Sequence, residues 1–100
     1  MMNAVIRVTV TGAAGKLGID VCKALVEGGY SVRATDKIAR RRRMLKLEVA
    51  DLLDRDACYR LVTGAGAVVH LANYSEMVIG DMQRLFNENA AMNMNVFTRR

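Results

Sequence analysis

Thr11-Gly12-Ala13-Ala14-Gly15-Lys16-Leu17-Gly18 sets the architecture of this chain, because it joins an apolar, β-branched run at residues 5–10 to an amphipathic segment at 16–27. Three glycines spaced three residues apart suit a strand–turn–helix unit. The first permits a sharp turn, the second lets backbone approach a phosphate, and the third lets helix and strand pack closely. N–H groups at the helix N-terminus then favour an anion. The run predicts a dinucleotide site; the alternative is three glycines that serve ordinary turns.

Length and composition limit the class of protein. The chain has 100 residues, of which 52% are apolar and 25% charged, and this predicts one small globular domain over residues 1–100. No apolar run approaches the roughly 20 residues of a membrane span, and the N-terminus lacks a secretory signal pattern. Cys22 and Cys58 lie far apart without a histidine cluster, which favours buried thiols over a disulfide or a metal site. We therefore expect a cytoplasmic protein without bound metal or membrane contact.

Positive charge is concentrated in one segment. The net charge is +5, but residues 33–46 hold seven basic side chains, including Arg40-Arg41-Arg42-Arg43, against one acidic side chain. The rest of the chain is therefore not basic. No aromatic residue interleaves the arginine block to stack on bases, which favours a solvated loop over a nucleic-acid interface.

Periodicity predicts alternating strands and helices. Strands are expected at 5–10, 31–35, 45–49 and 67–71, and helices at 17–27, at 57–62 with Asp51 or Asp54 as its cap, and at 82–97. Strands apolar on both faces indicate a parallel sheet, and right-handed crossovers then give an α/β, partial Rossmann-type fold of about four strands in the order 3-2-1-4. The fourth strand would have an unpaired edge, so we expect self-association or homo-oligomers through that edge.

Asp36 follows the second predicted strand, 18 residues after Gly18. A carboxylate at this point can accept both hydroxyls of an adenosine ribose and repels a 2′-phosphate. The alternative is an ordinary turn aspartate. Lys37 and the arginine block suit a 2′-phosphate instead. Because Asp36 lies closer to the ribose than a loop would, NAD is favoured over NADP.

Two other predicted strands end at the same edge of the sheet. Asp51 could accept the adenine amino group and Leu52 could pack on the ring, with helix capping as the alternative role of Asp51. His70 is expected to be structural rather than catalytic, since no aspartate or serine is placed to form a triad with it. The residues expected to bind the cofactor are Gly12, Gly15, Lys16, Leu17, Gly18, Asp36, Lys37, Asp51, Leu52, Leu71, Ala72 and Asn73.

At these residues the chain resembles the N-terminal part of the extended short-chain dehydrogenase/reductase family, the NAD-dependent epimerase/dehydratase group. The similar segments are residues 11–18 (TGxxGxxG), Asp36 (the ribose-binding acid), Asp51-Leu52 (the adenine-side Asp-Leu), His70-Leu71-Ala72 (HLA) and residues 89–96 (NxxGTxN). In the last segment Met92 and Asn93 replace Gly and Thr, which leaves the family's close helix packing open at that point.

The resemblance implies catalysis by a serine and a Tyr-x-x-x-Lys pair, whose tyrosine exchanges a proton while hydride moves to or from nicotinamide. Tyr30, Tyr59 and Tyr74 are not followed by lysine four residues later, so no catalytic residue is assigned. We expect the cofactor-binding portion of an oxidoreductase for a nucleotide-sugar or similar small-molecule substrate, inactive on its own. The alternative is a non-catalytic dinucleotide sensor or a basic-patch nucleic-acid-binding module.

Overall fold

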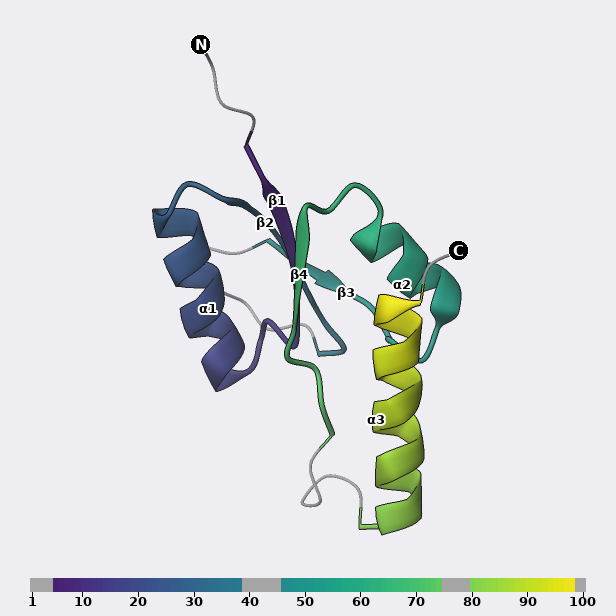
Figure 1. Ribbon diagram of the computed structural model, residues 1–100. Coiled ribbons are helices and arrows are strands. Elements are labelled where there is room, and N and C mark those ends of the chain that lie inside the picture. Colours follow the sequence, from purple (N-terminus) through teal and green to yellow (C-terminus); the bar gives the residue numbers. More distant parts are fainter. Residues whose placement is uncertain (1–4, 39–45, 75–79, 99–100) are drawn as a thin grey trace.

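The computed structural model describes residues 5–38, 46–74 and 80–98. Within them the chain forms a parallel sheet with helices on both faces (Figure 1). The elements are β1 (Arg7–Thr11), α1 (Lys16–Glu27), β2 (Ser31–Asp36), β3 (Leu47–Val49), α2 (Arg55–Val62), β4 (Ala67–His70) and α3 (Met82–Phe97). The strand order is β3-β2-β1-β4, which confirms the predicted α/β fold and topology.

Helix α1 covers one face of the sheet, and α2 and α3 lie together on the other (Figure 1). Beneath α1 the core is built from small apolar side chains. Val8 and Val10 of β1 and Ala34 of β2 pack there against Cys22 of α1, and each of these four is almost fully buried. This layer fixes α1, and with it the glycine loop, against the two central strands.

The opposite face of β1 was predicted to be apolar, but it carries threonines, as does the same face of β2. Thr9, Thr11 and Thr35 are buried, and their hydroxyls all make hydrogen bonds. Thr9 donates to the carbonyl oxygen of Leu61 on α2 over 2.8 Å, which ties that helix to the central strand. A buried hydroxyl is tolerated when it has a partner, so the polar face does not weaken the sheet.

The first strand begins later than the sequence indicated. Val5 and Ile6 precede β1 and are 68% and 50% exposed, so assigning them to a buried strand was wrong. Pairing with β2 starts at Arg7, opposite Ser31, so Val5 and Ile6 lie beyond the last paired residue and stay largely exposed. The third strand is shorter than predicted, since it begins at Leu47; residue 45 lies outside the described residues.

The helix ends follow from local chemistry. Gly28 and Gly29 end α1, where Gly29 has a φ of +89° and Tyr30 N–H donates to the carbonyl of Leu25, as in a Schellman motif. Asp54 caps α2 by accepting from two backbone N–H groups. The capping role considered for Asp51 therefore belongs to Asp54.

Strand β4 lies at one edge of the sheet, next to β1. On the neighbouring helix α3, Phe86 and Phe97 are largely exposed, whereas Met92 and Val96 are buried. Self-association through this edge stays a prediction.

Candidate functional site

Glycines hold the loop between β1 and α1 close to its neighbours. Gly12 has a φ of +66°, and a Cβ atom built there would lie 2.7 Å from the backbone nitrogen of Ala72. A Cβ atom on Gly18 would overlap the carbonyl oxygen of Gly12. Gly15 differs, because its Cβ would meet only the Gly12 oxygen, at 3.3 Å, and the residue lines a groove. The fold thus requires glycine at 12 and 18, whereas Gly15 keeps the groove open.

Helix α1 begins at this groove without a capping side chain. Gly15 occupies its N-cap position, and no side chain there accepts from the first turn of the helix. Helices α2 and α3 differ, since Asp54 and Asp81 each accept from two N–H groups of their first turns. Because N–H groups at a helix N-terminus carry partial positive charge, the start of α1 can receive an anion such as phosphate.

Asp36 stands at the end of β2 beside the same loop. Its Oδ2 accepts from Ala14 N–H over 3.0 Å, and its Oδ1 accepts from Lys37 N–H over 2.7 Å and weakly from Ile38 N–H over 3.4 Å. A carboxylate has about four acceptor positions, so at least one remains for a hydroxyl of a bound ligand. The bond to Ala14 also fixes the glycine loop relative to β2.

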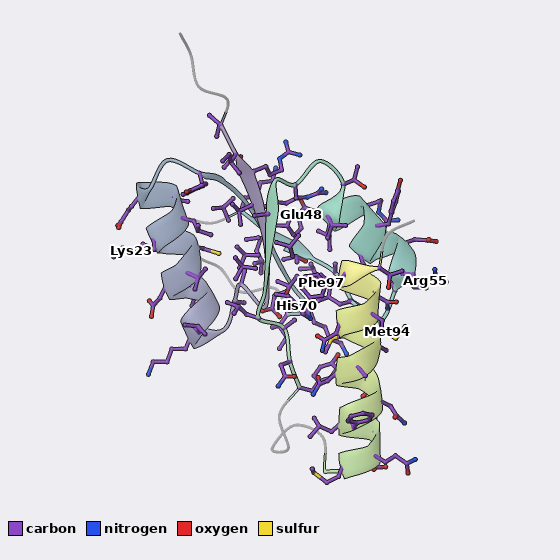
Figure 2. All side chains as sticks on the ribbon, in the orientation of Figure 1. Lys23, Glu48, Arg55, His70, Met94 and Phe97 are labelled. Carbon is purple, nitrogen blue, oxygen red and sulfur yellow. The ribbon has the colours of Figure 1, made fainter. Side chains whose placement is uncertain are left out.

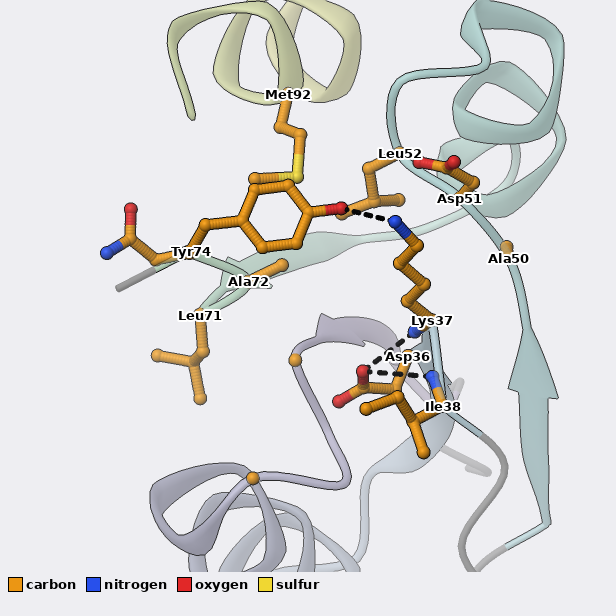
Figure 3. Close-up of a pocket in the computed structure, with 13 residues that line it drawn as sticks. Asp36, Lys37, Ile38, Ala50, Asp51, Leu52, Leu71, Ala72, Tyr74 and Met92 are labelled. Atoms are coloured by element: carbon orange, nitrogen blue, oxygen red, sulfur yellow. Dashed lines mark hydrogen bonds between the residues drawn. The ribbon is translucent and has the colours of Figure 1, made fainter. Parts of the chain in front are cut away.

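A groove of about 280 Å³ lies over the carboxyl ends of the strands (Figure 3). Small-molecule sites span roughly 300–1,000 Å³, so this volume suits one nucleoside portion of a dinucleotide. Most of the predicted cofactor residues line it: Gly12, Gly15, Asp36, Lys37, Asp51, Leu52, Leu71, Ala72 and Asn73. Lys16, Leu17 and Gly18 do not, and the side chain of Leu17 is exposed.

Four lining residues were missed from the sequence: Ile38, Ala50, Tyr74 and Met92. Ile38 and Ala50 directly follow predicted site residues or strand ends, which was a usable signal. Met92 is only 3% exposed and packs with Leu52, so the helix does pack closely here despite the departure from glycine. Methionine fills an irregular gap well because its side chain is unbranched and flexible.

Three asparagines of α3 hold the segments that line the groove. Asn89 accepts from Tyr74 N–H over 2.8 Å and donates to the Tyr74 carbonyl over 3.1 Å. Asn95 donates to the carbonyl of Leu52 over 2.9 Å. Asn93 pairs with His70. The sequence analysis singled out residues 89–96. It did not indicate that their side-chain amides hydrogen-bond to the segments at the ends of β3 and β4.

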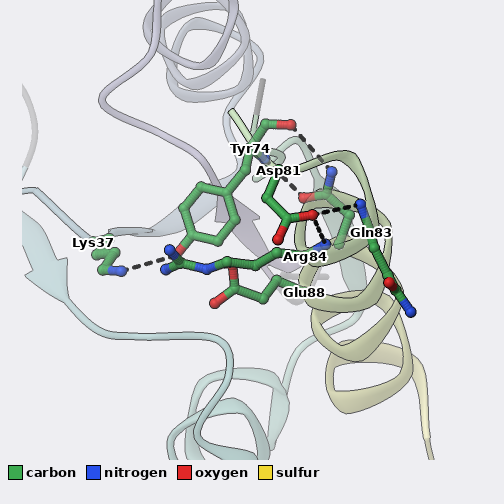
Figure 4. A network of polar contacts seen from close by, with 7 residues as sticks. Lys37, Tyr74, Asp81, Gln83, Arg84 and Glu88 are labelled. Atoms are coloured by element: carbon green, nitrogen blue, oxygen red, sulfur yellow. Dashed lines mark hydrogen bonds and ion pairs between the residues drawn. The ribbon is translucent and has the colours of Figure 1, made fainter. Parts of the chain in front are cut away.

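Lys37 and Tyr74 meet across the groove. The Lys37 ammonium donates to the Tyr74 hydroxyl over 2.9 Å and lies 5.2 Å from the centre of its ring (Figures 3 and 4). This hydrogen bond, with the nearby carboxylates of Asp51 and Glu88, raises the pKa of Lys37 above its ordinary value. Glu88 itself pairs with Arg84 on the same helix over 3.0 Å.

His70 has a structural environment. Its Nδ1 lies 2.6 Å from the Thr11 hydroxyl, its Nε2 lies 2.8 Å from Asn93 Oδ1, and Phe97 packs edge-on against the ring (Figure 2). The Thr11 hydroxyl accepts from the N–H groups of Leu71 and Ala72, so its own hydrogen can be donated to a neutral His70. Burial lowers the pKa of His70, against the opposing effect of the Asn93 bond.

The remaining predictions concern the arginine block, metal binding and membrane contact. The block at 40–43, on which the basic-patch alternative depends, lies outside the described residues. In the described part of the chain, no cluster of His, Cys, Asp and Glu is suited to a metal ion. The helices found there include none long and apolar enough to cross a membrane.

With this geometry established, comparison with known proteins identifies the family. The model of the NAD dependent epimerase/dehydratase family matches residues 8–99. The chain belongs to this family. A search of curated protein sequences found no significant match.

Solved structures of family-like enzymes share the fold. A uronate dehydrogenase variant from Agrobacterium tumefaciens, complexed with NAD, is 27% identical with a TM-score of 0.77, and the match covers 94% of this chain and 36% of that one. A GalE-like L-threonine dehydrogenase from Cupriavidus necator is 25% identical with a TM-score of 0.79, covering 90% and 31%. An L-threonine dehydrogenase from Phytophthora infestans is 25% identical with a TM-score of 0.78, and the match covers 90% of this chain and 31% of that one. This chain thus spans about a third of their length.

Proposed function

We propose that the chain binds NAD as the nucleotide-binding portion of an oxidoreductase of the epimerase/dehydratase family. The observation that carries the proposal is the convergence, at one groove, of an uncapped helix N-terminus, a glycine that leaves space, and the Asp36 carboxylate. These supply a phosphate site and a ribose acceptor side by side. The NAD-complexed uronate dehydrogenase, which has the same fold, supports this choice of ligand.

The groove residues fit the adenosine and pyrophosphate parts of NAD. Backbone at Gly15 and the start of α1 would face the pyrophosphate, and Asp36 would accept from the ribose. Leu52 would pack on the adenine, with Asp51 available to its amino group. Asp36 also repels a 2′-phosphate, which favours NAD over NADP. When bound, the nicotinamide supplies hydride acceptance or donation.

We assign no residue of this chain to proton transfer, because no tyrosine is followed by lysine four residues later. We propose that the intact protein oxidises or reduces a nucleotide-sugar or similar hydroxyl or carbonyl substrate, in the cytoplasm. The 100-residue chain alone is proposed to bind NAD without turning substrate over. A non-catalytic dinucleotide sensor would use the same groove, and only a turnover assay on the intact protein separates the two.

Titration calorimetry with NAD tests the proposal. Gly15→Val is expected to abolish binding, because a β-branched side chain would fill the space that the phosphate needs. Gly80→Val is the matched control, since a Cβ at Gly80 meets nothing within 4 Å. Unchanged affinity in Gly15→Val, or no binding of NAD by the wild type, would contradict the proposed site.

A further inference from the structure

Tyr74 is constrained through both its backbone and its ring. Its backbone N–H and carbonyl are both bonded to the Asn89 side chain, and its ring packs against the cluster formed by Leu52, Met92 and their neighbours. These contacts restrict both the backbone and the ring of Tyr74. Lys37, in contrast, is exposed and has a flexible stem. In this pair Tyr74 is the constrained residue, and its contact determines where the flexible Lys37 side chain lies.

The position of the Lys37 ammonium is unexpected from the sequence. Lys37 directly follows the acid that would accept the ribose, and a cation beside that acid is the usual means of binding a 2′-phosphate. Its backbone N–H does bond to Asp36, yet its side chain runs away from Asp36 and across the groove to Tyr74 (Figure 3). The charges of Asp51 and Glu88 also favour the ammonium form there and help to raise its pKa, after the Tyr74 bond.

We propose that Tyr74 is a positioning residue for cofactor selectivity. Its hydroxyl holds the Lys37 ammonium at the Asp51 side of the groove. Lys37 is therefore kept away from the position beside Asp36 where its charge would bind a 2′-phosphate. This inference rests on the proposed binding of NAD. It adds that the preference for NAD depends on Tyr74 as well as on the charge of Asp36.

The test uses the whole chain, with 5′-AMP and adenosine 2′,5′-bisphosphate as probes that differ only in the 2′-phosphate. The wild type is expected to bind 5′-AMP more tightly. Tyr74→Phe removes the hydroxyl, keeps the ring, and is expected to shift the affinity ratio about two- to fivefold toward the bisphosphate, the range of an exposed ion pair. Tyr74→Leu removes hydroxyl and ring, keeps an apolar side chain against the cluster, and should shift the ratio at least as far.

Lys37→Met provides the decisive background, because it removes the charge and keeps the stem. If Tyr74 acts through Lys37, Tyr74→Phe leaves the ratio unchanged in Lys37→Met. The arginines at 40–43 are present in every variant and cancel in this cycle. Thermal melting followed by circular dichroism checks that each variant is folded.

Two results would overturn the inference alone: a ratio that Tyr74→Phe and Tyr74→Leu leave unchanged, or an equal shift in the wild-type and Lys37→Met backgrounds. A wild type that binds neither 5′-AMP nor NAD would instead overturn the proposed function, and the selectivity with it.

Discussion

Both faces of the sheet carry an apolar cluster, and the face beneath α2 and α3 adds side-chain hydrogen bonds to it. Beneath α1, small apolar side chains pack around Val10 and Cys22, and Gly18 allows the helix to lie against the glycine loop. On the opposite face, the buried Thr9 and the asparagines of α3 hydrogen-bond to neighbouring segments. Close packing and the Asp36 bond to Ala14 thus place the phosphate loop, whereas the walls of the nucleoside groove depend on the cluster of Leu52 and Met92 together with directional hydrogen bonds.

The largest effect is expected from a substitution that disturbs the close packing between α1 and the glycine loop. Gly18→Val places a side chain against the Gly12 carbonyl and is expected to reduce the free energy of unfolding by about 3 kcal/mol, the upper end of the range for overpacking. Urea denaturation measures this loss. Lys23→Val, on the exposed part of the same helix, controls for β-branching and should change stability little. Equal effects of the two substitutions would show that close approach at Gly18 does not matter.

The hydrogen-bonded side should respond differently, with a smaller loss of stability and a weakened groove. Asn89→Ala leaves the Tyr74 N–H and carbonyl without their partner, which is expected to cost about 2 kcal/mol for two hydrogen bonds. It should also weaken binding of 5′-AMP, because Tyr74 is no longer held. Asn87→Ala, on the exposed side of α3, is the control for both measurements. Loss of stability with unchanged 5′-AMP affinity would mean that the clamp does not shape the groove.

The smallest expected effect is a pH dependence on the hydrogen-bonded side. Burial lowers the pKa of His70 in the folded state, so the unfolded state binds its proton more readily. The stability contributed by neutral His70 is therefore present above the ordinary value of 6.5 and is lost as pH falls below it, through the folded-state pKa. Urea denaturation between pH 8 and about pH 5 should show this decline.

His70→Gln removes the titrating ring and should flatten that part of the profile. A decline of the same size in His70→Gln would assign the pH dependence to other groups.

The sequence was sufficient for the architecture because its signals are local. Alternating strands and helices, three glycines after a strand, and aspartates at helix starts each depend on neighbouring residues, and topology then follows from right-handed crossovers. Where the prediction was wrong, the reason is not local. Val5 and Ile6 are as apolar as the strand that follows, but the partner strand begins opposite Arg7.

The groove residues at the ends of the strands could be predicted from the sequence, whereas the wall formed by Tyr74 could not. Asp36 and Asp51 follow predicted strands, so the shared edge of a parallel sheet brings them together. Tyr74 follows β4 in a loop, and its partners lie 37 residues earlier, at Lys37, and 15 residues later, at Asn89. No periodicity links residues at such separations, because only the packing of α3 against the strand ends makes them neighbours.

The Thr11 hydroxyl also has a consequence for motion. An edge strand usually opens before the centre of a sheet, and its amides then exchange with solvent hydrogen quickly. Here the N–H groups of Leu71 and Ala72, just beyond β4, are held by the hydroxyl of a fully buried threonine in the central strand β1. Releasing these amides requires Leu71 and Ala72 to separate from Thr11, so we expect them to exchange more slowly than the amides of an edge segment that faces solvent.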